Sequence, residues 1–294
     1  MHVAPFHALP VEAVAIAGGK GASLTRMTAA GLAVPPGFVV CAAAFASFLD
    51  QAAAVSFIGD LLTGLDVHDD SALERAAVSM REIITTGRVP DEIASAIRAA
   101  YQNMGVGAGD ASVAVRSSAV AEDGDAASFA GQQETYLDIR GAENVLRHVK
   151  DCWASFFSPR ALFYRARKGS LADIRMAVVV QEMIHADKSG VMFTVDPIRK
   201  RRTCMVVEAV RGLGEALVSG AVTPDHYVLN RADGSVAEEF IEEESTRILS
   251  HSELRDLQAA GLRLESLFGR PQDVEWCIRA RDLFLLQSRP ITTL

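Results

Sequence analysis

The amino-acid sequence predicts an α+β fold, in which helices and strands are mixed without regular alternation. Three stretches support this prediction. Residues 42–100 have an alanine-rich helical pattern, residues 176–180 form a continuous apolar run typical of a strand buried on both faces, and residues 272–290 contain two short strand-like stretches around a polar break. A doubly wound sheet is disfavoured, because it requires strands and helices that alternate along the chain.

Helices dominate the first part of the chain. Within residues 42–100, glycine and proline residues mark the expected breaks: Gly59, Gly64, Gly87 and Pro90. Asp91 is expected to cap the helix that follows Pro90. That helix is expected over residues 92–102, and further helices are expected over residues 22–30, 142–157, 159–168 and 251–268.

Strands are expected where β-branched and aliphatic residues cluster between turn signals. The expected strands cover residues 38–40, 112–116, 135–139, 176–180, 191–195 and 204–210. With 294 residues, the chain is long enough for two modest domains. We place the boundary between an N-terminal subdomain, residues 1–172, and a C-terminal subdomain, residues 173–294.

The last strand pair carries the most distinctive residue pattern. A hairpin symmetric about Arg281 sets Glu275 opposite Gln287 and Asp273 opposite Arg289. Alternation puts these four side chains on one face, because successive residues of a strand point to opposite faces. Carboxylate and amide oxygens suit Mg²⁺, and a guanidinium suits phosphate oxygens. A surface face with one cross-strand ion pair fits the same pattern. The opposite face is expected to join the core through Val274, Trp276, Ile278, Phe284 and Leu286.

Three stretches in the first half have residues suited to phosphate. Lys20 lies in a glycine-rich turn before a helix, where a backbone can approach a phosphate closely, although the spacing is not that of a P-loop. Arg116 ends a strand and is followed by two serines. A small-residue loop that could fold over a triphosphate contains Ser128, Ala130, Gly131 and Gln132. A plain turn, a surface arginine and an ordinary hairpin loop are the alternatives.

A fourth stretch follows the buried strand at residues 176–180 and suits an adenine ring, which needs a flat apolar slot with backbone donors and acceptors at its edge. It consists of Gln181, Glu182, Met183 and Ile184. Core packing of Met183 and Ile184 explains the same residues equally well. No nucleophile and base occur together, and His185 and His226 lie in no nucleophile-like context.

Composition excludes several classes of protein. The net charge of −8 argues against general nucleic-acid binding, and residues 199–202, the basic run, are expected to form a solvated turn. No apolar run reaches the length of a membrane span, and the first ten residues lack the order of a signal peptide. The four cysteines are far apart without metal-type pairing, which favours a reducing, cytoplasmic location.

Together these motifs are more specific than any one of them. In sequence and order, the chain resembles the nucleotide-binding domain of the family that contains phosphoenolpyruvate synthase, pyruvate phosphate dikinase and rifampin phosphotransferase. The matching stretches are residues 18–24, 31–40, 113–137, 152–155, 181–183, 189–197, 212–225 and 287–290.

The resemblance implies an ATP-grasp fold, in which two α+β subdomains hold ATP in a cleft between them. It implies that Lys20 and Arg116 bind the phosphates and that the loop around Gly131 closes over them. Glu275 and Gln287 are expected to hold Mg²⁺. Arg289 is expected beside the phosphates, where it acts in catalysis with the two other cationic residues. The resemblance also implies that Gln181, Met183 and Ile184 line the adenine pocket.

The resemblance further implies in-line phosphoryl transfer, in which the β-phosphate of ATP passes to a histidine on a separate swivelling domain and AMP and phosphate are released. None of the seven histidines here lies in the acceptor-type context, so we expect a histidine-bearing domain or partner. Pyruvate, inorganic phosphate and an ansamycin antibiotic all remain open as the final acceptor. The alternatives are a standalone ligase that activates a small molecule and a nucleotide-sensing subunit without catalysis.

Overall fold

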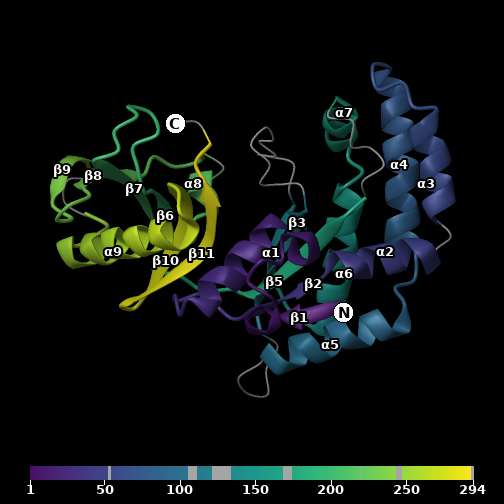
Figure 1. Cartoon of the computed structure of the whole chain (residues 1–294), viewed down its shortest axis with the longest axis horizontal. Helices are drawn as coiled ribbons and strands as arrows, with labels where there is room; N and C mark the ends of the chain where they lie inside the picture. Colours follow the sequence, from purple (N-terminus) through teal and green to yellow (C-terminus); the bar gives the residue numbers. More distant parts are fainter. Residues whose placement is uncertain are drawn as a thin grey trace. The chain divides into compact units, whose positions relative to one another are not determined.

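The computed structural model describes residues 1–51, 54–104, 111–120, 134–167, 174–218, 220–242 and 247–292 (Figure 1). Its internal contacts divide the chain into two compact units. Unit 1 contains Met1–Thr25 and Pro36–Met183, and unit 2 contains Arg26–Pro35 and Ile184–Leu294. Each unit has helices packed on an antiparallel sheet, so the predicted α+β class is confirmed.

Unit 1 is built on a five-stranded sheet in the order β1-β2-β5-β3-β4, with every neighbouring pair antiparallel. Its strands are β1 (Val3–Pro5), β2 (Gly37–Val40), β3 (Val113–Ala119), β4 (Thr135–Ile139) and β5 (Met176–Glu182). The apolar run that predicted a doubly buried strand is β5, the central strand, and Val178, Val179 and Val180 are completely buried.

Helix α1 (Val14–Ala29) belongs to unit 1 up to Thr25. The other helices of unit 1 are α2 (Ala42–Gln51), α3 (Ala54–Thr63), α4 (Asp70–Thr86), α5 (Asp91–Met104), α6 (Ala142–Ser155) and α7 (Pro159–Arg167), with a short 3₁₀ helix η1 (Phe6–Ala8). Their core centres on Trp153 of α6, which stacks on Phe45 with 5.3 Å between ring centroids and also contacts Phe48. These rings bury large apolar areas, which fixes α2 against α6.

Three of the expected helix breaks in unit 1 lie beside helices, and one does not. Gly64 and Gly87 follow α3 and α4, and Pro90 precedes α5. Gly59 instead lies inside α3, because a glycine in a helical conformation weakens a helix without ending it. Asp91 is the first helical residue of α5 and its carboxylate accepts a bond from Arg88, so the predicted capping role is wrong.

Unit 2 is built on a six-stranded antiparallel sheet in the order β11-β10-β6-β7-β8-β9. Its strands are β6 (Lys188–Phe193), β7 (Cys204–Arg211), β8 (Asp225–Asn230), β9 (Val236–Phe240), β10 (Gln272–Arg279) and β11 (Asp282–Pro290). Its helices are α8 (Glu215–Val218) and α9 (His251–Phe268).

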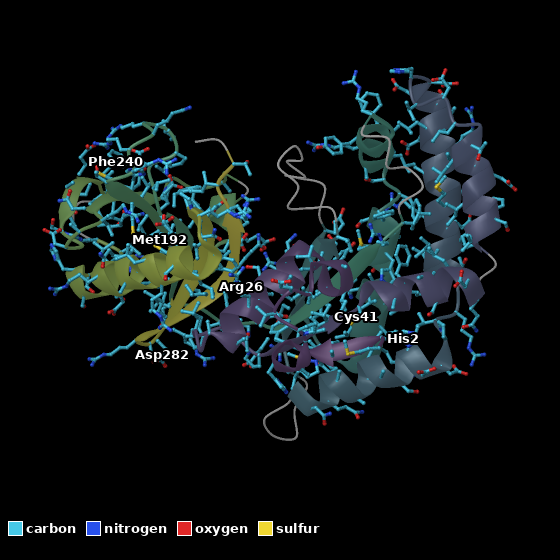
Figure 2. The ribbon with its side chains drawn as sticks, in the orientation of Figure 1. His2, Arg26, Cys41, Met192, Phe240 and Asp282 are labelled. Carbon is cyan, nitrogen blue, oxygen red and sulfur yellow. The ribbon has the colours of Figure 1, made fainter. Side chains whose placement is uncertain are left out.

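Helix α9 covers one face of this sheet. Met192 of β6 packs against α9 at Gly261, where an added methyl carbon would be 3.2 Å from the Met192 Cε atom (Figure 2). The guanidinium of Arg231, the residue after β8, donates hydrogen bonds to the carboxylate of Glu265 on α9. This ion pair holds the helix against the sheet. The side chains that point away from α9 therefore form the other face of the sheet.

The boundary between the two units differs from the predicted one, because unit 1 continues to Met183 instead of ending at residue 172. Strand β5 pairs with β2 and β3, so residues 176–183 belong to unit 1 rather than to a subdomain that begins at residue 173. The early segment Arg26–Pro35 belongs to unit 2. There, the Leu285 N–H donates to the Ala33 carbonyl over 2.8 Å, and Arg26 donates to the Leu267 carbonyl.

All four cysteines are free and buried. Burial raises the pKa of Cys277 to about 12, which keeps this thiol protonated near neutral pH. Cys41 follows β2 in unit 1 (Figure 2). Among the described residues no single helix is both long and apolar enough to cross a membrane, although α2 and α3 reach that length and composition as a bent pair.

Candidate functional site

The glycine-rich segment around Lys20 forms a kink inside α1. Gly18 has φ 68° and ψ 177°, a non-helical conformation in which an L side chain is strained. A Cβ atom there would be 2.2 Å from the Ser118 carbonyl oxygen and 2.3 Å from its hydroxyl. The glycine thus permits a close approach to Ser118 of β3, whereas the sequence analysis expected the backbone to approach a phosphate here. The helix also begins at Val14 rather than after the glycines.

The two predicted cationic residues of the first half come together in unit 1. Lys20 is 7% exposed, and its Nζ atom donates to the carbonyl oxygen of Ser117 over 3.2 Å. Ser117 is the residue after Arg116, which is 9% exposed on β3 opposite Val179 of β5. Arg116 is the middle residue of β3 (Val113–Ala119), so the prediction that it ends a strand is wrong. A buried positive charge interacts strongly with an anion, since low-dielectric surroundings screen it weakly.

The stretch predicted for adenine lies at the end of β5. Gln181 is buried and faces Gly37 and Ala114 in the sheet. The N–H of Glu182 donates to the Pro36 carbonyl over 2.8 Å, and the N–H of Met183 donates to Ser112 over 2.9 Å. Internal bonds therefore use both of these N–H groups. Ile184 is buried as well and is the first residue of this part of unit 2.

The register predicted for the closing hairpin is confirmed. Glu275 of β10 lies opposite Gln287 of β11, and Asp273 lies opposite Arg289. The Arg289 Nε atom donates to the Asp273 carboxylate over 2.8 Å, which orients the guanidinium. Burial raises the pKa of Asp273 in spite of the adjacent Arg289 charge.

One part of the hairpin prediction is wrong. A β-bulge between Glu275 and Trp276 shifts the register, so Trp276 faces Leu285 instead of Leu286. A bulge places two residues against one and so changes which residue points inward. Leu285 is accordingly 2% exposed, and the expected core residues Phe284 and Leu286 are only half-buried.

Sheet register reveals a functional candidate that the sequence analysis missed. Val191 of β6 faces Glu275 on one side and Glu208 of β7 on the other, and Glu208 faces His226 of β8. Glu208 and His226 are 3.5 Å apart between Oε1 and Nδ1. The signal was present, because Glu208 is a single carboxylate inside an otherwise apolar strand.

The hairpin of β10 and β11 carries two side-chain oxygen donors that suit a cation. Glu275 and Gln287 offer one carboxylate and one amide oxygen, which fits Mg²⁺ because this ion usually keeps several waters and takes one or two protein ligands. Within the described ranges, no three His, Cys, Asp or Glu side chains gather into a metal-binding group. The predicted phosphate loop, Ser128, Ala130, Gly131 and Gln132, lies outside the described residues.

Taken by themselves, buried cationic side chains and a carboxylate–amide pair fit a protein that binds a polyphosphate together with a divalent cation. Comparison with known families agrees with this class. Residues 14–294 match the family described as the pyruvate phosphate dikinase AMP/ATP-binding domain, and the chain belongs to this family. The resemblance drawn from the sequence motifs is therefore confirmed.

Named relatives include two kinds of enzyme. A probable phosphoenolpyruvate synthase of Methanothermobacter thermautotrophicus is 43% identical over 100% of this chain and 46% of its own length. The probable phosphoenolpyruvate synthase of Methanocaldococcus jannaschii is 42% identical over 96% of this chain and 26% of its own length. A rifampicin phosphotransferase of a Streptomyces species is 40% identical over 97% of this chain and 35% of its own length. The chain thus spans between 26% and 46% of the length of these relatives.

Proposed function

We propose that this chain is the ATP-binding part, with an ATP-grasp fold, of a phosphotransferase that passes the β-phosphate of ATP to a histidine on a separate swivelling domain or partner. AMP and phosphate are the other products. The observation that carries the proposal is that unit 1 holds Lys20 against Ser117, the residue after Arg116. The name of one relative, rifampicin phosphotransferase, supports transfer of phosphate, and the description of the family as an AMP/ATP-binding domain supports ATP as the source.

In unit 1, Lys20 and Arg116 bind phosphate oxygens and neutralise the charge that develops during transfer. Gln181, Glu182, Met183 and Ile184 line the adenine ring. Because the N–H groups of Glu182 and Met183 are bonded internally, other groups of this stretch contact the edge of the ring.

In unit 2, Glu275 and Gln287 hold Mg²⁺, which supplies charge neutralisation at the phosphates when it is bound. Arg289 contacts a phosphate oxygen, and Asp273 keeps its guanidinium in the required orientation through the 2.8 Å bond. A cytoplasmic location is part of the proposal, supported by four free, buried thiols.

The transfer step is tested with ATP labelled separately at the β- and γ-phosphates. The chain is mixed with a histidine-bearing swivelling domain, and the label on that domain is measured. The proposal expects β-label on histidine and release of AMP. γ-label on a small acceptor with ADP as product would instead identify a ligase. ATP binding without any turnover would identify a nucleotide-sensing subunit.

A further inference from the structure

We infer that Ser118 is a positioning residue whose hydroxyl completes the kinked helix α1 and thereby holds Lys20 where it binds phosphate. The inference rests on the proposed function, because it assumes that Lys20 contacts the phosphates of ATP. Its evidence lies within unit 1, where α1 and β3 are neighbours (Figure 1).

The Ser118 hydroxyl replaces one hydrogen bond of the helix. In an uninterrupted α-helix the Gly21 N–H would donate to the Ala17 carbonyl, four residues earlier. Here the Ser118 hydroxyl accepts from the Gly21 N–H over 3.2 Å and donates to the Ala17 carbonyl over 2.8 Å. A side chain from β3 has therefore inserted into the hydrogen-bond ladder of α1, which is a recognised cause of a helix kink.

Only a small residue with a hydroxyl suits this position. A serine oxygen is both a donor and an acceptor, so it satisfies both separated backbone groups at once. Ser118 and Ala17 are both 0% exposed, so water does not reach them as a substitute. Gly18 makes the insertion possible, because a Cβ atom there would be 2.3 Å from the same hydroxyl oxygen.

The inserted hydroxyl determines the position of Lys20. Ala17 and Gly21 lie on either side of Lys20 in the sequence. The carbonyl oxygen of Ser117, the residue before Ser118 in β3, accepts the hydrogen bond from the Lys20 Nζ atom. Without the hydroxyl, two buried backbone groups lose their partner. The Gly21 N–H and the Ala17 carbonyl can then satisfy each other only if the segment returns to a regular helix. That change rotates Lys20 about the helix axis and moves its amine from the end of β3.

The test compares ATP with adenosine, which has no phosphates, as ligands of the same variants. Ser118→Ala is expected to weaken ATP binding by about tenfold, equivalent to about 1.4 kcal/mol, and to leave adenosine binding unchanged. Ser155→Ala is the matched control, because it removes a buried hydroxyl that donates to the Cys152 carbonyl inside α6. In a Lys20→Ala background, Ser118→Ala is expected to cause little further loss, since both changes remove the same contact.

Equal ATP affinity in Ser118→Ala and the wild type would overturn the inference, and so would an equal loss for ATP and adenosine. If Ser118→Ala does not fold, Ser118→Cys keeps a weaker donor and acceptor and gives the same comparison. A loss confined to ATP supports the inference, and any other result opposes it. A wild type that binds no ATP, or binds it independently of Lys20, refutes the proposed function. ATP binding that depends on Lys20 but not on Ser118 refutes this inference alone.

Discussion

Gly18→Ala is the substitution for which the structure gives the clearest expectation. The added methyl would be 2.2 Å from the Ser118 carbonyl oxygen and 2.3 Å from its hydroxyl, distances that carbon and oxygen atoms do not adopt without a covalent bond. The backbone at φ 68° and ψ 177° is also a conformation almost restricted to glycine. Helix α1 and the end of β3 must therefore separate in this variant.

The cost has two parts. A non-glycine residue in this backbone conformation costs about 1–3 kcal/mol. Displacement of Ser118 breaks its bonds to Ala17 and Gly21, each with a net value of about 1 kcal/mol. We expect Gly18→Ala to lower the free energy of unfolding of unit 1 by about 4 kcal/mol.

The assay uses the two tryptophans, because Trp153 lies in unit 1 and Trp276 lies in unit 2. In a Trp276→Phe background, fluorescence during denaturant unfolding reports on unit 1. Gly59→Ala is the control, since nothing lies within 4 Å of that position in α3 and alanine is expected to stabilise the helix by about 0.5–1 kcal/mol. An unfolding midpoint for Gly18→Ala at or above that of the background protein would refute the reasoning.

Two further expectations concern unit 2. Gly190→Ala places a methyl carbon 1.9 Å from the Glu208 carbonyl oxygen and 2.7 Å from the Trp276 ring. It should therefore lower the free energy of unfolding of unit 2 by about 3 kcal/mol or more. Trp276 fluorescence in a Trp153→Phe background measures this change. An unchanged midpoint would contradict the close pairing of β6 and β7. Glu265 is expected to make unit 2 sensitive to acid. Burial alone would raise its pKa, but hydrogen bonds from Arg231 and Thr194 and the Arg231 charge outweigh burial and lower the pKa below 4.5. The stabilisation that the ionised Glu265 carboxylate gives to unit 2 is thus complete above pH 4.5 and is lost as the pH falls through the lowered pKa of Glu265. Unfolding midpoints between pH 3 and 7 should fall less on acidification in Glu265→Gln than in the wild type, and parallel curves would count against this assignment.

Features set by local periodicity were predictable from the sequence. The apolar run at residues 176–180 predicted the central strand β5, and the polar break around Arg281 predicted that Glu275 faces Gln287. Both depend on residues close together in the sequence: a continuous apolar run in the first case, and two strand-like stretches around a short polar turn in the second.

Features set by contacts between distant segments were not predictable. The kink at Gly18 depends on Ser118, one hundred residues away, and the glycine run alone is equally compatible with a turn before a helix. The bulge after Glu275 exchanges Leu286 for Leu285 in the core, and two adjacent leucines give no compositional sign of that exchange. The place of Glu208 across Val191 from Glu275 depends on sheet register, which the sequence does not display.

Calorimetric titration of ATP, with and without Mg²⁺, tests most directly the proposed roles of Lys20 and Glu275 in nucleotide binding. The wild type should bind ATP more tightly with Mg²⁺. Lys20→Ala and Glu275→Ala should each weaken that binding by at least about tenfold. Glu92→Ala, which changes a carboxylate that is 85% exposed on α5, should bind as the wild type does. An absence of binding by the wild type, or affinities unchanged in both Lys20→Ala and Glu275→Ala, would contradict the account.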